Sequence, residues 1–545
     1  FGTTLSIGSA HTSMGGTFTT TFMSNPQRAG MSIVTATGLN TQHPYMRFFG
    51  VSAKISQITP IRGTVGTVVT VIGDGFGGEE MVRIDFGSTQ TITQISATLA
   101  GTFSIGFTVN TQGFGTTTIT AYGLESIQHP SKVFKIESEI VSVTPVSGTV
   151  GSVVTISCTG YGSGETVRIA FGINSSIQTV VAGQYGSWTT SWTIDTQAHG
   201  NTTITAIGAG VATNVFSIQP QIVSVVPAAG SVGTIVTIYS TGYAAGETVN
   251  IAFGTNATIQ TAAAGQYGSF TTSWTVDVQA FGTTTITASG AGVATNVFSI
   301  QPQVVSVVPT AGSVGTIVTI YSTGYAASET VNIAFGTNAN IQQAVAGEYG
   351  SWTTSWTIDA QKYGTTTITA GGVNVAKNVF SIQPHVVSII PTQGSVGTIV
   401  TISCTGYGPS NTIRISFGST NTLTTAKASG YGTMTTTFTV NTQIFGTTSV
   451  VATSQNTKDM SGKYINSYKE FKIIAVIYIT PTEGTVGTEV TVTGNGYGAV
   501  ENISVDFGTT MGIVNTQSTA NGSWTAVFTT NPQSTLSILV TAVGA

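Results

Sequence analysis

The chain has 545 residues, of which 7% are charged and 40% are hydrophobic, and its formal net charge is −4. It is too long for a single hydrophobic core and too hydrophobic to be disordered, so we expect several folded domains. Its 16 basic residues look scattered, which argues against nucleic-acid or anionic-membrane partners, and no apolar run of about 18 residues predicts a membrane span.

A Phe-Gly step recurs along the chain and marks it as a tandem array. The step stands at Phe1, Phe86, Phe171, Phe253, Phe335, Phe417 and Phe507. Because Phe1 corresponds to a point partway through a unit, we expect residues 1–53 to be the second half of a domain. Complete units are predicted at 54–138, 139–220, 221–302, 303–384 and 385–473. A last unit at 474–545 is expected to lack its final strand.

Within each unit, short runs of alternating or β-branched residues are broken by Gly, Asn and Pro. This pattern predicts a β-sandwich of about seven strands and negligible helix. In the unit 221–302 the expected strands are Ile222 to Val226, Thr234 to Ser240, Thr248 to Phe253, a weaker one near Ile259, Ser269 to Val276, Thr283 to Ala288 and Val297 to Ile300.

One strand of each unit carries an aromatic row on a single face. Trp188, Trp192 and Ile194 alternate with Thr and Ser, as do Trp352 and Trp356. Strand alternation predicts that these aromatics face the core, although an exposed row could instead stack on sugars. Cys158 and Cys404 occupy equivalent strand positions, so we expect buried, inert thiols.

A corner motif, Asn or Asp followed two residues later by Gln, appears seven times. The pairs are Asn25/Gln27, Asn110/Gln112, Asp195/Gln197, Asp277/Gln279, Asp359/Gln361, Asn441/Gln443 and Asn531/Gln533. We expect Asn or Asp to close the corner by bonding its own downstream backbone. Calcium is the alternative, but the exchange of Asp with Asn argues against a metal. Glutamates recurring before a strand, at 80, 165, 247, 329 and 501, are interpreted as solvated turn residues.

The opening of several units carries a family resemblance. Ile58-Thr59-Pro60 with the segment 63–77, and Ile479-Thr480-Pro481 with the segment 484–498, resemble IPT/TIG-type immunoglobulin-like domains of cell-surface proteins. The resemblance implies immunoglobulin-like modules and leaves the activity open. Because one unit passes into the next with hardly a spacer, we expect a stiff rod.

The incomplete terminal units allow two interpretations. In one, the sequence is a segment of a longer repetitive polypeptide. In the other, subunits polymerise by strand donation, in which one chain completes the last domain of the next. The candidate donor strand is Met46, Arg47, Phe48, Phe49, Gly50, Val51, Ser52 and Ala53.

No nucleophile with its base, carboxylate pair or metal-ligand spacing is present, so we expect no enzyme activity and no cofactor. Candidate N-glycosylation sites are Asn174, Asn201, Asn256, Asn502 and Asn521. We therefore predict an extracellular, self-assembling subunit of a cell-surface filament, sheath or S-layer-like lattice. Its partner would be itself, with surface glycans or envelope proteins as further possibilities. The alternative is the stalk of an adhesin or glycan-binding surface protein whose head lies outside this segment. A third possibility is a glycan-binding array, for which Tyr185, Tyr267 and Tyr349 are candidate contacts.

Overall fold

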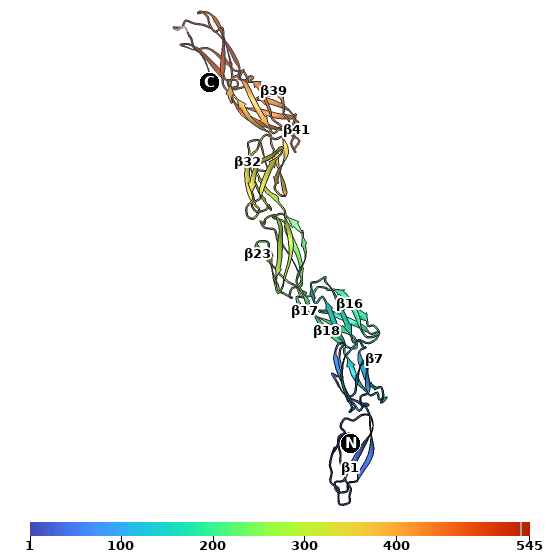
Figure 1. The fold of residues 1–545 in the computed structure, drawn as a ribbon. Coiled ribbons are helices and arrows are strands. Elements are labelled where there is room, and N and C mark those ends of the chain that lie inside the picture. The colour runs from blue at the N-terminus through green and yellow to red at the C-terminus, as the bar shows by residue number, and fades with distance from the viewer. Residues whose placement is uncertain (535–536) are drawn as a thin grey trace. The chain divides into compact units, whose positions relative to one another are not determined.

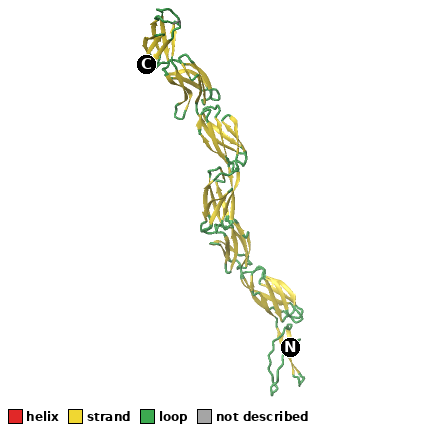
Figure 2. Cartoon of the chain, turned by 90° about the vertical axis from the view of Figure 1, so that its left-hand side faces the viewer, coloured by secondary structure: helices red, strands yellow, loops and turns green. Residues whose placement is uncertain are grey.

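The computed structural model describes residues 1–534 and 537–545, and these residues form 48 strands and no helix. Figure 1 follows the strands along the chain, and Figure 2 shows only strands and loops. The all-β fold predicted from the sequence is confirmed. Contacts divide the chain into two compact units, one of residues 1–226, 237–274 and 285–296, the other of 227–236, 275–284 and 297–545.

Each complete sandwich pairs a three-stranded sheet with a five-stranded one. In the sandwich of 303–382 the sheets have the orders β27-β29-β32 and β28-β34-β33-β30-β31. The strands are β27 (Gln303–Val308), β28 (Ala311–Gly312), β29 (Ile317–Thr323), β30 (Thr330–Phe335), β31 (Asn338–Val345), β32 (Trp352–Thr357), β33 (Gly364–Gly371) and β34 (Val375–Ile382). This two-sheet order is immunoglobulin-like.

The core lies between the two sheets and contains the aromatic row. Trp352, Trp356 and Ile358 are buried together with Phe335 and Phe380. The corresponding residues of the other rows, such as Trp188 and Met434, are also buried. The row therefore builds the core, as predicted, and each large apolar side chain contributes roughly 1.5–3 kcal/mol through burial.

The sandwich of 221–300 differs in detail from the strands expected there. It contains β19 (Gln221–Val226), β20 (Ala229–Gly230), β21 (Ile235–Thr241), β22 (Thr248–Phe253), β23 (Asn256–Ala263), β24 (Phe270–Thr275), β25 (Gly282–Ser289) and β26 (Val293–Ile300). The short β20, parallel to β26, was missed because two residues leave no alternation to detect. The strand near Ile259 is eight residues long, and the last strand begins four residues earlier than expected.

The sandwiches of 54–136 and 139–218 contain the same eight strands in the same order. Cys158 in β13 (Val153–Thr159) and Cys404 are both free and buried, as expected. Burial raises the pKa of each thiol to about 12, so neither is a thiolate near neutral pH.

Residues 1–53 form the framework of half a sandwich. The hairpin of β1 (Gly30–Thr37) and β2 (Pro44–Val51) pairs Gly30 with Val51, the register in which Gly115 pairs with Ile136 in the next sandwich. The ring of Phe1 lies 5.6 Å from that of Phe22 and 5.4 Å from that of Phe49. The equivalent three rings of the next sandwich are Phe86, Phe107 and Phe134, which also pack together and are all buried.

The last sandwich has two three-stranded sheets, β43-β44-β47 and β46-β45-β48. Its strands are β43 (Val476–Thr480), β44 (Glu489–Asn495), β45 (Asn502–Phe507), β46 (Thr510–Gln517), β47 (Trp524–Thr529) and β48 (Val540–Gly544). Among the described residues no strand pairs with the outer edge of β48. Val540 and Ala542 are consequently half-buried, whereas the equivalent Val450 and Ala452 are fully buried.

Candidate functional site

The Phe-Gly step and the corner motif are two parts of one device. In all seven copies the Gln Nε2 donates to the Asn or Asp Oδ1 two residues earlier, at 2.8–3.0 Å. The partner of Asn or Asp is thus the Gln side chain, and the expectation of a backbone partner was wrong. The Gln Oε1 in turn accepts the N–H that follows Phe-Gly, for example that of Ser88 at 3.4 Å.

Glycine is required after phenylalanine because the buried Gln lies against it. Gly336 has φ +58°, and a Cβ there would lie 2.3 Å from Gln361 Oε1. The Gln side chain is buried, with Gln361 3% exposed, and its own amide is satisfied by the corner and, in copies such as Gln112, also by the turn after Phe-Gly. Each corner is therefore fixed to the core strand that ends at Phe-Gly.

Two residues beyond each of the first six Gln residues, the corner bonds to the next sandwich. The backbone N–H there donates to a carbonyl of the following sandwich at 2.7–3.1 Å in six successive places. The pairs are Ala29 to Phe76, Phe114 to Tyr161, His199 to Tyr243, Phe281 to Tyr325, Tyr363 to Tyr407 and Phe445 to Tyr497. We call these pairs the joints, and each lies within one compact unit.

The accepting tyrosine ties the joint to the core of its own sandwich. Tyr325 is 1% exposed, and its hydroxyl donates to the Ala370 carbonyl at 3.0 Å. Its N–H donates to the Gly350 carbonyl at 3.0 Å. The other four tyrosines bond in the same way, to Ala206, Ala288, Ala452 and Ala542. Burial raises the pKa of these phenols, to about 12 for Tyr243, so the hydroxyl stays a donor.

A second glycine makes room for the joint. Gly350 has φ +71°, and a Cβ there would lie 2.0 Å from the Tyr325 carbonyl oxygen and 3.0 Å from Ala280 Cα of the preceding sandwich. Equivalent glycines stand at 101, 186, 268, 432 and 522, each with a positive φ. A side chain at this position would push the two sandwiches apart.

The covalent link at each joint is two residues long. β34 ends at Ile382 and β35 (His385–Ile390) begins at His385, leaving Gln383 and Pro384 between them. A Cβ on Gly406 would lie 2.3 Å from the Gln383 carbonyl oxygen, so the link rests on the next sandwich. Such a link has none of the slack of a flexible Gly/Ser linker.

The recurring glutamates are structural acceptors, and their interpretation as solvated turn residues was wrong. Glu80 is fully buried, and its carboxylate accepts from the N–H of Gly77 and Glu125 and from the N–H and hydroxyl of Ser126. Burial opposes its ionisation, but these hydrogen bonds hold its pKa below the ordinary value. The half-buried Glu329 likewise accepts from Val373 in the turn that joins the last two strands.

Asn411 replaces this glutamate in the sandwich of 385–473. Its Oδ1 accepts from the hydroxyls of Ser454, at 2.8 Å, and Thr457, at 2.6 Å. Here the two last strands, β41 (Gly446–Lys458) and β42 (Tyr464–Ile473), continue beyond the point where β33 and β34 turn. Asn411 thus holds the base of a longer hairpin.

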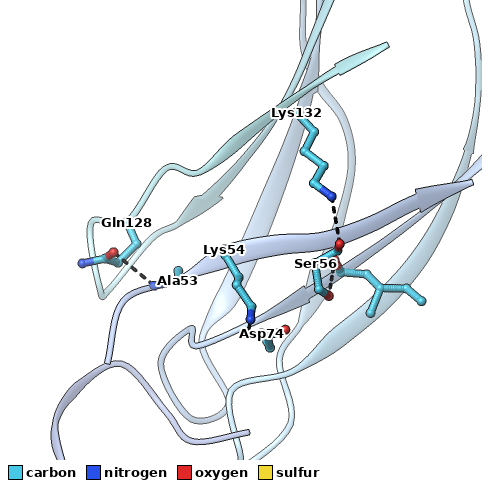
Figure 3. Close-up of polar contacts among 7 residues, drawn as sticks. Ala53, Lys54, Ser56, Asp74, Gln128 and Lys132 are labelled. Atoms are coloured by element: carbon cyan, nitrogen blue, oxygen red, sulfur yellow. Dashed lines mark hydrogen bonds and ion pairs between the residues drawn. The ribbon is translucent and has the colours of Figure 1, made fainter. Parts of the chain in front are cut away.

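Side chains of the last strand also hold the first strand of each complete sandwich. Figure 3 shows Lys132 of β10 (Ser131–Ile136) donating to the Ser56 carbonyl of β3 (Lys54–Thr59) at 2.8 Å. Lys469 reaches Val387, and Asn296 reaches Ile222, in the same way. Arg47, the equivalent residue of β2, bonds its neighbour Met46 instead.

All five candidate glycosylation residues, Asn174, Asn201, Asn256, Asn502 and Asn521, are exposed. Asn174 and Asn256 begin the equivalent edge strands β15 (Asn174–Val181) and β23. Their glycosylation stays a prediction. Tyr185, Tyr267 and Tyr349 are also exposed, and each directly precedes the glycine of a joint.

The candidate donor strand, Met46 to Ala53, is largely β2. Phe49 is 50% exposed although its counterpart Phe134 is fully buried. However, β2 pairs with β1 over all eight residues, through the edge that a donated strand would offer to β48. Strand donation therefore stays a prediction and would require β2 to leave β1.

Neither a metal cluster nor a membrane-spanning helix is found in the described part of the chain. No three His, Cys, Asp or Glu side chains gather there as potential metal ligands. No helix in the same residues is long and apolar enough to cross a bilayer.

The joints were missed in the sequence reading although their parts repeat visibly. The Gly-Tyr step after the second long strand, the corner motif and the glycine before the aromatic strand all recur at a fixed spacing. Their spacing gave no sign that they meet across two domains, because each lies far from its partner along the chain. For example, Phe281 and Tyr325 are brought together only by the stacking of sandwiches.

Comparison with known proteins gives structural likeness only. No known protein family and no curated protein matches the chain. A four-domain ectodomain fragment of ICAM-5 is 12% identical with a TM-score of 0.24, covering 78% of this chain and all of that one. The eight N-terminal immunoglobulin domains of Down syndrome cell adhesion molecule are 10% identical with a TM-score of 0.17. That match covers 95% of this chain and 77% of the other.

Salmonella alpha-2-macroglobulin is 9% identical with a TM-score of 0.15. The matched region includes 94% of this chain and 48%, about half, of that protein. At such identities and TM-scores these likenesses carry no argument about function. The immunoglobulin-like assignment rests on the strand order described above. The narrower resemblance to IPT/TIG domains stays a prediction.

Proposed function

We propose that this chain is an extracellular structural protein whose successive sandwiches act as one load-bearing element. The observation that carries the proposal is the joint, built six times from the same backbone hydrogen bond. A chain whose domains only needed tethering would gain nothing from two reserved glycines and a two-residue link at every junction, or from a tyrosine anchor at five of the six. Few charges and exposed sequons support an external location.

We further propose that copies of the chain associate with one another in a filament, sheath or S-layer-like lattice. Residues 1–53 contain Arg28 and Arg47 and no carboxylate, whereas residues 474–545 contain Glu483, Glu489, Glu501 and Asp506 and no basic residue. Opposite charge on these two regions favours head-to-tail contacts over contacts between like regions.

Amide hydrogen exchange on the intact chain tests the joints. The N–H groups of Phe114, His199, Phe281, Tyr363 and Phe445 should exchange as slowly as amides inside the strands, because each is bonded to the next sandwich. Rapid exchange at these positions would show that the sandwiches move independently and would contradict the load-bearing role.

Electron microscopy and light scattering of the purified chain test self-assembly. A structural subunit should form regular polymers as its concentration rises. A chain that stays monomeric at all concentrations and salt levels would favour the stalk of an adhesin.

Glycan binding is the second candidate, and the exposed Tyr185, Tyr267 and Tyr349 favour it. Aromatic side chains in turns can stack on sugar rings. Titration with oligosaccharides, followed by tyrosine and tryptophan fluorescence, should then give a saturable change that disappears when all three tyrosines are replaced by alanine.

A further inference from the structure

The basic residues fall in two stretches of eight each, residues 28–168 and residues 362–472, so the expectation that they are scattered was wrong. Eight carboxylates balance the first stretch, whereas the second has an excess of positive charge. Residues 362–472 contain eight basic residues, and less the two carboxylates Asp459 and Glu470 this leaves +6. The eight are Lys362, Lys377, Arg414, Lys427, Lys458, Lys463, Lys469 and Lys472. Residues 169–361 contain no Lys or Arg and six carboxylates, which gives −6.

The extended hairpin of β41 and β42 carries part of this positive charge. Lys458 and Lys463 flank its tip, and both are exposed, as is Met460 between them. The tip is ordered by Asp459, whose Oδ1 accepts from the N–H of Ser461 at 2.9 Å and of Lys463 at 3.0 Å. The Lys458 ammonium lies 4.9 Å from the centre of the Tyr464 ring.

This charge is not neutralised within the chain. The ion pairs among the described residues are Lys54–Asp74, Arg62–Glu137 and Arg83–Asp85, all in or beside the sandwich of 54–136. The replacement of the usual glutamate by Asn411 removes one more negative charge from the base of the hairpin. The hairpin therefore offers a structured, exposed surface to an anionic partner.

We propose that this surface, the hairpin tip 455–464 of the basic stretch 362–472, docks on the acidic stretch 169–361 of a second copy of the chain. The two regions have equal and opposite charge, and the acidic stretch presents the exposed Glu348 beside a joint. The hairpin of one copy would then contact a different part of the second copy. The inference rests on the proposed self-assembly and names the surface that makes its lateral contact.

The experiment measures association of the full chain by light scattering between about 10 mM and about 1 M salt, where the screening length falls from about 30 Å to about 3 Å. Wild-type association should weaken steeply with salt. Lys458→Glu/Lys463→Glu should weaken it by at least about tenfold at low salt. Lys463→Glu should weaken it more than Lys135→Glu, a matched reversal of an exposed lysine in the first sandwich. Mixing the Lys463→Glu chain with a Glu348→Lys chain should restore part of the association.

Association that is insensitive to salt and to the hairpin substitutions would overturn this proposal while leaving self-assembly standing. A chain that never associates would overturn both. Binding of an anionic polysaccharide such as heparin, lost in the hairpin variant while self-association is unchanged, would also overturn it and identify a glycan site. Circular dichroism melting of each variant, expected to match the wild type, shows that the sandwich remains folded.

Discussion

The sandwiches of 303–382 and 385–473 share their core and their joint but differ at the turn before the last strand. Tyr325 and Tyr407 bond Ala370 and Ala452 in the same way. In the first, Glu329 closes a tight turn, whereas in the second Asn411 supports a long basic hairpin. The comparison teaches that the hydrogen bonds of the joint are the same in both sandwiches, whereas the turn before the last strand differs in length and in charge.

The largest effect should come from removing the shared tyrosine anchor. Tyr325→Ala and Tyr407→Ala should each destabilise their own sandwich by about 3–5 kcal/mol, because a fully buried ring is replaced by a cavity. Hydrogen exchange of β33 and β41 in the intact chain measures the two losses separately. A large loss in one sandwich and none in the other would break the comparison. Tyr325→Phe, the matched control, should cost about 1 kcal/mol through the lost hydrogen bond.

A smaller effect is expected from filling the space reserved at the joint. Gly350→Ala and Gly432→Ala should each cost roughly 1–2 kcal/mol for the positive φ, and should expose the joint amide of Phe281 or Tyr363 to exchange. Gly347→Ala, in the same turn without a positive φ, is the control. Unchanged protection of the joint amide would show that the joint does not need the glycine.

Acidification should separate the sandwich that uses Glu80 from the one that uses Asn411. Since hydrogen bonds keep the pKa of Glu80 below its unfolded value, its stabilising effect is complete above that value and is lost as the pH falls through the folded pKa. Exchange at Glu125 and Ser126 should therefore accelerate below about pH 4, beyond the intrinsic pH dependence. Ser454 and Thr457 should show no such step, and Glu80→Gln should abolish it.

The smallest effect concerns the hairpin tip. Asp459→Ala removes the acceptor of the Ser461 and Lys463 amides, and hydrogen bonds also keep the pKa of Asp459 below its ordinary value. We expect faster exchange of these two amides with no change in melting temperature. A drop in melting temperature would mean that the hairpin is part of the sandwich and not an independent surface.

The sequence predicted the elements whose information is local. Alternation revealed the core face of strands such as Trp352 to Thr357, and the fixed spacing of Phe-Gly revealed the repeats. It failed where the deciding contact is remote. In the sequence the recurring glutamates look like surface turn residues. Only the fold shows that Glu80 accepts hydrogen bonds from a turn that lies more than 40 positions further along the chain. The excess of basic residues over carboxylates at 362–472 was readable from the sequence and was overlooked.

Phe76 occupies the joint position that holds a tyrosine in the five later sandwiches. Its ring is fully buried and packs on Phe103 at 5.2 Å, but it has no hydroxyl with which to hold the neighbouring strand. Under tension along the chain, the sandwich of 54–136 should therefore yield before the four complete sandwiches that follow it. Such a yielding element would lengthen the chain under a sudden pull and shield the remaining sandwiches from rupture.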